Sequence, residues 1–329
     1  MTVYEAVVDS SDANISHTLI VEEVGSDKTV LDVGCATGYL AEALGRNGCT
    51  VSGIEYSTEA AEAARAHLDQ LVVADLNAVT LADAFSGRSF DTVVFGDVLE
   101  HLLDPAAALR SAASLLAPGG KVVVSIPNVA HGSVRLALLA GRWNYADRGL
   151  LDATHIRFFT YETLQDLLWD SGYVLESARS TVVDALATEI HIPSGVLSPE
   201  VVDWVRSRPY ADAYQFVVTA RLRTPEDTRP DVQVRPAATL PAVDDEYTQK
   251  AAVIRADRHS LLTMKDHIIG LEAENAASRA RVPALERKIR KLNAELGKVA
   301  EDRATIYRSS TWRIGRAALA PVRIIRRGR

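Results

Sequence analysis

The most constraining feature of this sequence is the stretch "VLDVGCATGYLAEALGRNGCTVSGIEYS" at residues 30–57. An apolar run leads into two glycines, Gly34 and Gly38; a helix-like segment follows, and a second apolar run ends at Glu55. A strand that passes through a glycine-bearing turn into a helix and then into a second strand leaves room for a ligand to approach the backbone. The stretch therefore predicts an α/β fold with a ligand site where the first strand ends.

The details of the turn narrow the choice of ligand. A dinucleotide site has the pattern G-x-G-x-x-G, but here Ala36 takes the second glycine position and Tyr39 the third. This disfavours a bound pyrophosphate and hence a nicotinamide dehydrogenase. Asp32 before the turn suits a ligand ammonium group, and Glu55 at the end of the second strand suits a ribose diol. Adenosine with a cationic amino-acid tail fits both carboxylates.

Strand-like and helix-like segments alternate through the first two thirds of the chain. Seven apolar runs are predicted strands, at residues 29–34, 50–55, 71–75, 90–97, 121–127, 173–179 and 214–222. Five segments between them are predicted helices, at residues 39–47, 58–67, 105–116, 133–139 and 161–171. The rotation of strand and helix predicts an α/β doubly wound, mostly parallel seven-stranded sheet.

Five short motifs lie at the expected strand ends: "LDVGCATG", "GIEYS", "VVADL", "FGDVLEHLLDP" and "LLAPGGKVVVSIPN". In this order they resemble the motifs of class I S-adenosylmethionine-dependent methyltransferases, in particular the ubiquinone-biosynthesis O-methyltransferase-like branch, over about residues 14–223. The resemblance implies a Rossmann-like fold and S-adenosylmethionine as the cofactor. It also implies that Gly34, Ala36 and Gly38 border the methionine moiety, that Asp32 orients its amino group and that Asp97 flanks it.

The same resemblance assigns the adenosine end of the cofactor. Glu55, with Tyr56 beside it, would bind the ribose hydroxyls, and Asp75 with Leu76 would hold the adenine edge. Ala36 is the departure from the family pattern, since many relatives have glycine there. Asp75 could equally cap a helix, which would be a structural role alone.

Methyl transfer to a hydroxyl requires removal of a proton, and histidine is the first candidate base because its pKa lies near neutrality. His155 follows the fifth predicted strand and His101 follows the fourth, so either is a candidate catalytic residue, and another group or none remains an alternative. Related enzymes carry a similar H-x-R-x-F-T stretch around His155, where Thr160 could instead cap the next helix. His131 is expected to be a loop residue, and no grouping along the chain has metal-ligand spacing, so no metal is predicted.

Several classes of protein are excluded by composition. Cys35 and Cys49 are the two cysteines, too few for a disulfide scaffold, and we expect both to be small core residues. No run of about 18 apolar residues could span a bilayer, and the acidic N-terminal segment does not resemble a signal peptide. The sequence predicts a cytoplasmic protein.

The chain continues beyond the predicted methyltransferase domain at residues 1–224. Residues 225–246 contain four prolines in their first 17 positions and predict a solvated linker. Residues 247–306 then carry a heptad pattern with 12 of 16 a and d positions apolar, which predicts a coiled coil and a homodimer. Asn275 at an a position could fix the register, whereas Pro283 opposes a continuous helix. A single amphipathic helix folded back on the domain is the alternative.

The last segment, residues 307–329, is basic and amphipathic. Eight arginines and no acid occur from Arg303 onward, whereas residues 1–302 carry 28 basic against 43 acidic side chains. Such a tail is suited to an anionic membrane surface, which would place the enzyme peripherally at the inner face of the membrane. Nucleic acid is disfavoured because no known nucleic-acid-binding motif accompanies the charge. A plain solvated tail is the other alternative.

The acceptor is the least constrained feature. Residues suited to stacking on a sugar or pairing with phosphate lie between residues 142 and 157: Arg142, Trp143, Tyr145, Arg148 and Arg157. The "S-x-TWR" tail resembles the C-terminal ends of bacterial enzymes that build surface glycans. The sequence therefore predicts O-methylation of a sugar or cell-surface glycan hydroxyl. The alternatives are a small phenolic or quinone-like metabolite as the acceptor, or an assembly scaffold with a vestigial methyltransferase fold.

Overall fold

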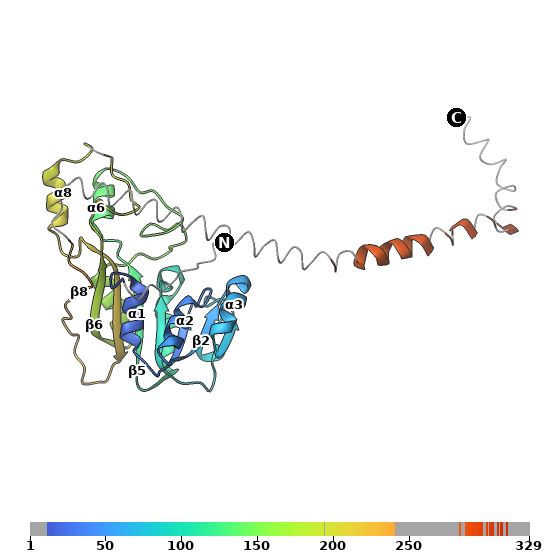
Figure 1. The fold of residues 1–329 in the computed structure, drawn as a ribbon, viewed down its shortest axis with the longest axis horizontal. Coiled ribbons are helices and arrows are strands. Elements are labelled where there is room, and N and C mark those ends of the chain that lie inside the picture. The colour runs from blue at the N-terminus through green and yellow to red at the C-terminus, as the bar shows by residue number, and fades with distance from the viewer. Residues whose placement is uncertain are drawn as a thin grey trace. The chain divides into compact units, whose positions relative to one another are not determined.

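The computed structural model describes residues 12–193 and 195–240, and in the C-terminal part residues 287–298 with shorter pieces at 283, 301, 303–305, 308, 310–311 and 314. The chain divides into two compact units, Met1–His267 and Ile268–Arg329, and each is described by itself. The first unit is a layered α/β body (Figure 1).

One mixed sheet forms the centre of the first unit. Its strands are β1 (Thr29–Val33), β2 (Thr50–Glu55), β3 (Gln70–Val73), β4 (Phe90–Gly96), β5 (Leu116–Pro127), β6 (Tyr173–Val182), β7 (Ala213–Leu222) and β8 (Arg235–Pro236). They lie in the order β3-β2-β1-β4-β5-β7-β6-β8. Strands β1 to β5 pair in parallel, and β7 is antiparallel to both its neighbours. The predicted α/β, mostly parallel sheet is confirmed, but the number of strands is eight rather than seven.

Helices lie on both faces of this sheet. They are α1 (Ser16–Val24), α2 (Tyr39–Arg46), α3 (Thr58–Ala64), α4 (Leu81–Ala84), α5 (Pro105–Ala113), α6 (Gly132–Leu139), α7 (Tyr161–Asp170) and α8 (Pro199–Arg206), with 3-10 turns η1 (Arg65–His67) and η2 (Leu99–His101). Helices α1, α4 and α8 were not predicted from the sequence. In Figure 1, α6 and α8 lie together beyond one end of the sheet.

Local sequence explains where the helices begin. The Asp104 side chain accepts a hydrogen bond from the Ala107 amide, and Pro105 occupies the first turn of α5, where its missing N–H costs nothing. Thr160 and Thr163 form a reciprocal capping box at the start of α7. The helix cap that the sequence allowed at Thr160 is therefore confirmed.

The Pro-Gly-Gly stretch before residue 121 departs from prediction. We expected it to end a helix and precede a strand, but α5 ends at Ala113 and β5 already begins at Leu116. The pairing with β4 jumps from Phe90–Leu116 to Thr92–Lys121, so the extra residues form a bulge within the strand. A glycine with φ +77° at position 119 permits this bulge.

Alternate residues of the parallel strands contribute side chains to two apolar layers, one on each face of the sheet. Leu31 and Phe95 join the layer that includes Leu109 of α5, whereas Val30 and Val94 join the layer with α1 and α2. Burial on both faces explains why the strands are continuous apolar runs in the sequence. The two cysteines are free and buried, as expected.

Residues 225–240 contact the first unit at several points, although most of their side chains are exposed. Val232 and Val234 pack against the main core, and the Tyr161 hydroxyl donates a hydrogen bond to the Val232 carbonyl. Arg229 pairs with Asp166 of α7 at 2.5 Å. The pairing of β8 with β6 falls in the same segment.

The second unit is described mainly at residues 287–298, which are helical. Ile289, Leu292 and Leu296 are 57%, 49% and 66% exposed, so within the part of the chain that the structure describes this helix carries an exposed apolar stripe. Most of the predicted coiled coil at 247–306 and of the tail at 307–329 lies outside the described residues. None of the described helices has the length and apolar character needed to cross a membrane.

Candidate active site

The turn after β1 is built from residues in the left-handed backbone region. Gly34, Ala36 and Gly38 have φ values of 74°, 46° and 82°. A Cβ atom at Gly34 would lie 2.6 Å from a methyl of Val98, and one at Gly38 would lie 2.9 Å from the Cα of Ala64. The two glycines are therefore required both by conformation and by close packing. The turn is held rigidly between α3 and the segment after β4.

Glu55 braces this turn from the end of β2. Its Oε2 accepts a hydrogen bond from the Ala36 amide at 3.0 Å, and its Oε1 accepts one from the Ser57 amide at 2.9 Å. The side chain is buried, at 7% exposure. Each carboxylate oxygen keeps a further lone pair, so Glu55 can still accept hydrogen bonds from a ligand diol.

Asp32 lies in β1, one residue before that strand ends, and is 2% exposed. Its Oδ2 has no hydrogen-bond partner among the described residues. Burial, and secondly the neighbouring Glu55 carboxylate, raise the pKa of Asp32 to about 7. A buried carboxylate with an open oxygen favours a cationic ligand group beside it.

The residues assigned to the adenosine end are more exposed. Tyr56 follows β2 and is 52% exposed, and Leu76 is half-buried against the main core. The Asp75 Oδ1 accepts hydrogen bonds from the Asn77 amide at 2.9 Å and from the Asn77 side chain at 3.0 Å. Asp75 therefore stabilises a turn after β3 through one of its two carboxylate oxygens.

Asp97 follows β4 with a left-handed backbone, at φ 56°. Its Oδ1 accepts hydrogen bonds from the Ser125 hydroxyl at 2.5 Å and from the side-chain amide of Gln215. Ser125 belongs to β5 and Gln215 to β7, so two strands fix one carboxylate. Strained backbone that the surroundings hold in place is common at functional sites. Gln215 was missed because nothing in its local pattern distinguishes it from other residues of its strand.

His17 is a second residue that sequence analysis missed. It lies on α1, with its ring centroid 4.7 Å from that of Tyr39 at the start of α2. Burial lowers the pKa of His17, and the Asp97 carboxylate opposes that shift. The amphipathic pattern of residues 16–24 was the signal that could have placed His17 at the glycine turn.

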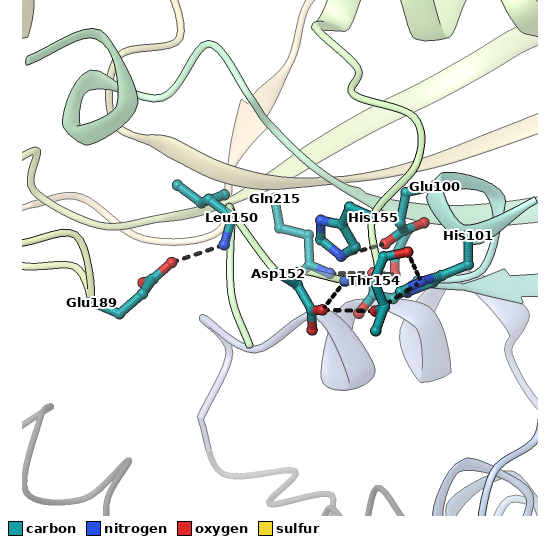
Figure 2. Close-up of polar contacts among 10 residues, drawn as sticks. Glu100, His101, Leu150, Asp152, Thr154, His155, Glu189 and Gln215 are labelled. Atoms are coloured by element: carbon teal, nitrogen blue, oxygen red, sulfur yellow. Dashed lines mark hydrogen bonds and ion pairs between the residues drawn. The ribbon is translucent and has the colours of Figure 1, made fainter. Parts of the chain in front are cut away.

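The two predicted catalytic histidines meet beyond the end of β4, with ring centroids 4.9 Å apart. His155 is 9% exposed, and its Nε2 lies 3.9 Å from the Glu100 Oε1. The His101 Nδ1 lies 3.2 Å from the Thr154 carbonyl oxygen. Figure 2 shows the side chains of His155, His101 and Glu100 directed toward one another.

Glu100 is the acid of this group, and sequence analysis did not select it. It is 1% exposed, and neither carboxylate oxygen has a hydrogen-bond partner among the described residues. Burial first, and then the Asp97 charge, raise the pKa of Glu100 well above its ordinary value. Burial and the neighbouring His101 lower the pKa of His155, which favours a neutral imidazole.

Glu100, His101 and His155 could together hold a metal ion, because one ligand atom from each lies within 4.8 Å of the others. The sequence predicted no metal, since His155 is far from the other two along the chain. A metal requires an ionised carboxylate and neutral imidazoles. The raised pKa of Glu100 opposes the first requirement, whereas the lowered pKa of His155 meets the second.

His131 is not a loop residue of the kind we expected. It is fully buried, its Nε2 lies 2.9 Å from the Val183 carbonyl oxygen, and its Nδ1 accepts from the Ser133 amide at the start of α6. Burial lowers its pKa to about 4. His131 therefore caps a helix and fills the core.

The segment between α6 and α7 presents aromatic rings to solvent. Trp143 and Tyr145 are 36% and 58% exposed, and Trp143 packs edge-on against Phe158 with ring centroids 5.4 Å apart. Phe158 in turn contacts His155 at 6.2 Å. Arg157 donates to the Leu103 carbonyl at 2.7 Å and so ties the segment to the loop before α5. Trp143 and Phe158 thus form a row of packed aromatic rings that leads from the surface to His155.

Part of this chain matches the sequence pattern of a known protein family. Residues 16–178 match the family model described as "Methyltransferase domain", a span just under half of the chain. This span is therefore similar to known methyltransferase domains. A crystal structure of magnesium protoporphyrin IX methyltransferase from Synechocystis with bound S-adenosylhomocysteine is 17% identical, with a TM-score of 0.43, and the similarity covers 67% of this chain and 90% of that one.

Curated relatives are more similar in sequence. A ubiquinone biosynthesis O-methyltransferase from Psychrobacter arcticus is 36% identical over 154 residues, which are 44% of this chain and 59% of that protein. A protein of the same name from Xanthomonas euvesicatoria is 39% identical over 129 residues, 38% of this chain and 53% of that protein. The chain thus spans between half and two thirds of the length of these relatives.

Proposed function

We propose that the protein, with a methyltransferase domain at residues 16–178, is an S-adenosylmethionine-dependent O-methyltransferase. S-adenosylmethionine supplies an electrophilic methyl group when bound. The observation that carries the proposal is the buried, open oxygen of Asp32 beside a glycine turn that Glu55 braces. That arrangement suits a ligand with an ammonium group near a ribose.

The residues around the turn fit this cofactor. Asp32 would receive the ammonium group, which would compensate the burial of its carboxylate. Glu55 would accept hydrogen bonds from the ribose hydroxyls with its remaining lone pairs. Gly34 and Gly38 adopt the left-handed backbone and the close packing against Val98 and Ala64 that shape the turn beside Asp32, where the methionine moiety would lie.

Further residues complete the proposed cofactor site. Asp97, held by Ser125, would flank the methionine side, and Ala36 presents its amide to Glu55 at the turn. Tyr56 and Asp75 with Leu76 would border the adenosine end, where exposure leaves them accessible to a ligand.

His155 is the proposed general base. Its ring lies 4.9 Å from that of His101, and its Nε2 lies 3.9 Å from the Glu100 Oε1. A neutral imidazole placed there would accept a proton from the acceptor hydroxyl. The lowered pKa keeps the imidazole neutral near pH 7, as a base must be before the reaction. His101, at the more open side of the pair, is the alternative base.

The acceptor is proposed to be a hydroxyl of a small molecule that enters beside Trp143. The names of the curated relatives favour a quinone-like or phenolic ring. The exposed rings of Trp143 and Tyr145 would stack equally on a sugar, the acceptor that the tail suggested. A chain truncated after residue 240 separates the two, because residues 225–240 pack on the domain and must be kept. Full turnover of the truncated chain on soluble phenols favours the metabolite.

We also propose that the apolar stripe of residues 287–298 pairs with a second copy of the chain. The exposed Ile289, Leu292 and Leu296 support this pairing. The basic residues that follow would then contact an anionic membrane from the cytoplasmic side. The C-terminal segment would in that case concentrate a soluble catalytic domain near lipid-linked acceptors.

Calorimetric titration of the full chain with S-adenosylhomocysteine tests the proposal first. Binding at a single site is expected; no binding would leave the scaffold alternative in place. A methyl-transfer assay with His155→Ala tests the base. Turnover should fall while affinity for S-adenosylhomocysteine is unchanged, and undiminished turnover would remove His155 from this role.

A further inference from the structure

We propose that Gln215 is a positioning residue for Asp97 and that it fixes the direction in which this carboxylate meets the amino-acid end of the cofactor. The inference rests on the proposed function, in which Asp97 flanks the methionine moiety. Gln215 lies near the start of β7, 118 residues beyond Asp97 along the chain. None of the five methyltransferase-like motifs of the sequence includes Gln215.

One oxygen of the Asp97 carboxylate receives both side-chain donors. The Ser125 hydroxyl donates a hydrogen bond to the Asp97 Oδ1 at 2.5 Å, and the side-chain amide of Gln215 donates to the same oxygen. A carboxylate oxygen has two lone pairs, so these two donors use the hydrogen-bonding capacity of Oδ1. The other oxygen, Oδ2, is therefore the one that a ligand would meet.

Two donors from different directions fix the plane of this carboxylate. A carboxylate held by one hydrogen bond can still rotate about its Cβ–Cγ bond, because that torsion has only a broad preference in aspartate. Ser125 holds the Asp97 backbone as well, since its carbonyl oxygen accepts a hydrogen bond from the Asp97 amide at 3.2 Å. Gln215 supplies the contact that comes from beyond this neighbouring strand, and so it restricts the rotation that Ser125 permits.

The strand order explains why a long side chain is needed at position 215. Strand β5 lies between β4 and β7, so Gln215 reaches across β5 to Asp97. Neighbouring strands are about 4.8 Å apart, and the two residues come from strands separated by about twice that distance. Gln215 pairs with Pro127, the last residue of β5, and therefore lies at the same edge of the sheet as Asp97.

The glycine turn lies at this edge too. Strand β4 pairs with β1, and the last partners of that pairing are Phe95 and Val33, just before Asp97 and the turn. Val98 packs so closely on Gly34 that a Cβ there would lie 2.6 Å from a Val98 methyl. A ligand seated at the turn would thus have Asp97 beside it.

Loss of the Gln215 donor should affect one end of the ligand. A carboxylate that rotates freely must be ordered when the ligand binds, and this ordering lowers the affinity. The adenosine end would be bound by Glu55, whose two hydrogen bonds to the Ala36 and Ser57 amides do not involve Gln215. The loss is therefore expected only for ligands that carry the amino-acid end.

Titration calorimetry of the full chain with two ligands tests this expectation. S-adenosylhomocysteine carries the amino-acid end, whereas 5′-methylthioadenosine has the adenosine and the sulfur without it. Gln215→Met keeps the length of the side chain but removes the donor. Its affinity for S-adenosylhomocysteine should fall about 10-fold, the lower range for a hydrogen bond to a charged group, and its affinity for 5′-methylthioadenosine should not change.

Gln233→Met is the matched control. The Gln233 side-chain amide also donates to an aspartate, the Asp231 Oδ1 at 3.1 Å, but at the exposed surface of the same unit. This variant should bind both ligands as the unaltered protein does. Equal weakening of both ligands in Gln215→Met would indicate a general structural loss and overturn the inference, as would an unchanged affinity for S-adenosylhomocysteine. If the unaltered protein binds neither ligand, the proposed cofactor is wrong and the inference fails with it.

A double-mutant cycle tests whether Gln215 acts through Asp97. Asp97→Gly removes the carboxylate, and glycine suits the backbone at this position, where φ is 56°. In the Asp97→Gly background, Gln215→Met should lower the affinity for S-adenosylhomocysteine no further. A second loss of about 10-fold in that background would show that Gln215 acts without Asp97, which contradicts the positioning role.

Discussion

Three carboxylates at the ends of adjacent strands differ in their hydrogen-bond partners. Glu55 accepts two backbone amides, Asp97 accepts a hydroxyl and a side-chain amide, and Asp32 has one oxygen with no partner among the described residues. A buried acid without a partner is costly, whereas a fully bonded one is not. The difference supports the proposal that a ligand cation binds beside Asp32, whereas Glu55 supports the turn.

Glu55→Gln is expected to weaken binding of S-adenosylhomocysteine by about 1.5 to 3 kcal/mol, the range for hydrogen bonds to charged groups. The amide replaces one accepting oxygen by a donor, which faces the Ala36 or Ser57 amide. Titration calorimetry measures the affinity. Glu62→Gln on α3, where the carboxylate pairs with Arg65 at the surface, is the control and should bind normally. Equal affinities in all three proteins would contradict the role of Glu55.

Asp32→Asn should stabilise the cofactor-free protein, and by more at pH 8 than at pH 5. The folded state holds its proton up to about pH 7, whereas the unfolded chain loses it near the ordinary pKa of 3.8. Between those values a rise in pH favours the unfolded state, so the stability linked to this proton is lost as pH rises. Urea unfolding at the two pH values measures the difference. A stability change in Asp32→Asn that is the same at both pH values would show that Asp32 ionises equally in both states.

At the scale of elements, the site depends on how closely α2 and α3 approach the turn. The first turn of α2 begins directly after Gly38, and the backbone of α3 lies against that glycine. The α1 helix adds Leu19 and Ile20 to the layer that also contains Leu40 of α2. Three helices thus pack around a turn in which Ala36 is a non-glycine residue with a left-handed backbone.

Gly38→Ala tests this close approach. Left-handed strain of about 1 to 2 kcal/mol adds to an overpacking cost of about 1 to 3 kcal/mol against the Ala64 backbone. Gly87→Ala is the matched control, because Gly87 also has a positive φ, of 78°, but its Cβ would meet nothing within 4 Å. Denaturant unfolding should show a smaller loss for Gly87→Ala, from strain alone. Equal losses would mean that the contact with α3 is not tight.

At the scale of the whole molecule, an α/β unit is followed by a second unit whose described residues are helical. The first unit buries both faces of its sheet and keeps its site at the strand ends. The helix at residues 287–298 instead exposes apolar side chains at positions 289, 292 and 296, a spacing of three and four. This spacing matches one seam of a coiled coil, and burial of the seam requires a second helix.

Leu292→Glu is expected to convert a dimer of the full chain to monomer, because a charge at the seam cannot be buried without a partner. Lys291→Glu introduces the same side chain one position away from the seam and should leave the dimer intact. Sedimentation velocity over a range of concentrations distinguishes the two. A dimer that survives Leu292→Glu would place the interface elsewhere.

Much of the fold could be predicted because its signals are local. Continuous apolar runs marked all seven long strands, and the glycine turn between Asp32 and Glu55 marked the strand ends that form the site. Helix α1 was missed because its apolar face is short. The contacts of the proline-rich segment at 225–240 were not predicted because they involve distant residues such as Tyr161.

Local sequence is sufficient for the βαβ unit, the two-sided burial of the sheet and the acids that follow its strands, since each depends on residues within a few turns of one another. The meeting of Glu100 with His155, and the reach of Glu189 to Leu150, arise instead from the folded arrangement of the whole unit. These contacts join loops that leave different strands. Strand order sets which loops become neighbours, and that order follows from packing the entire sheet, which no local pattern of residues encodes.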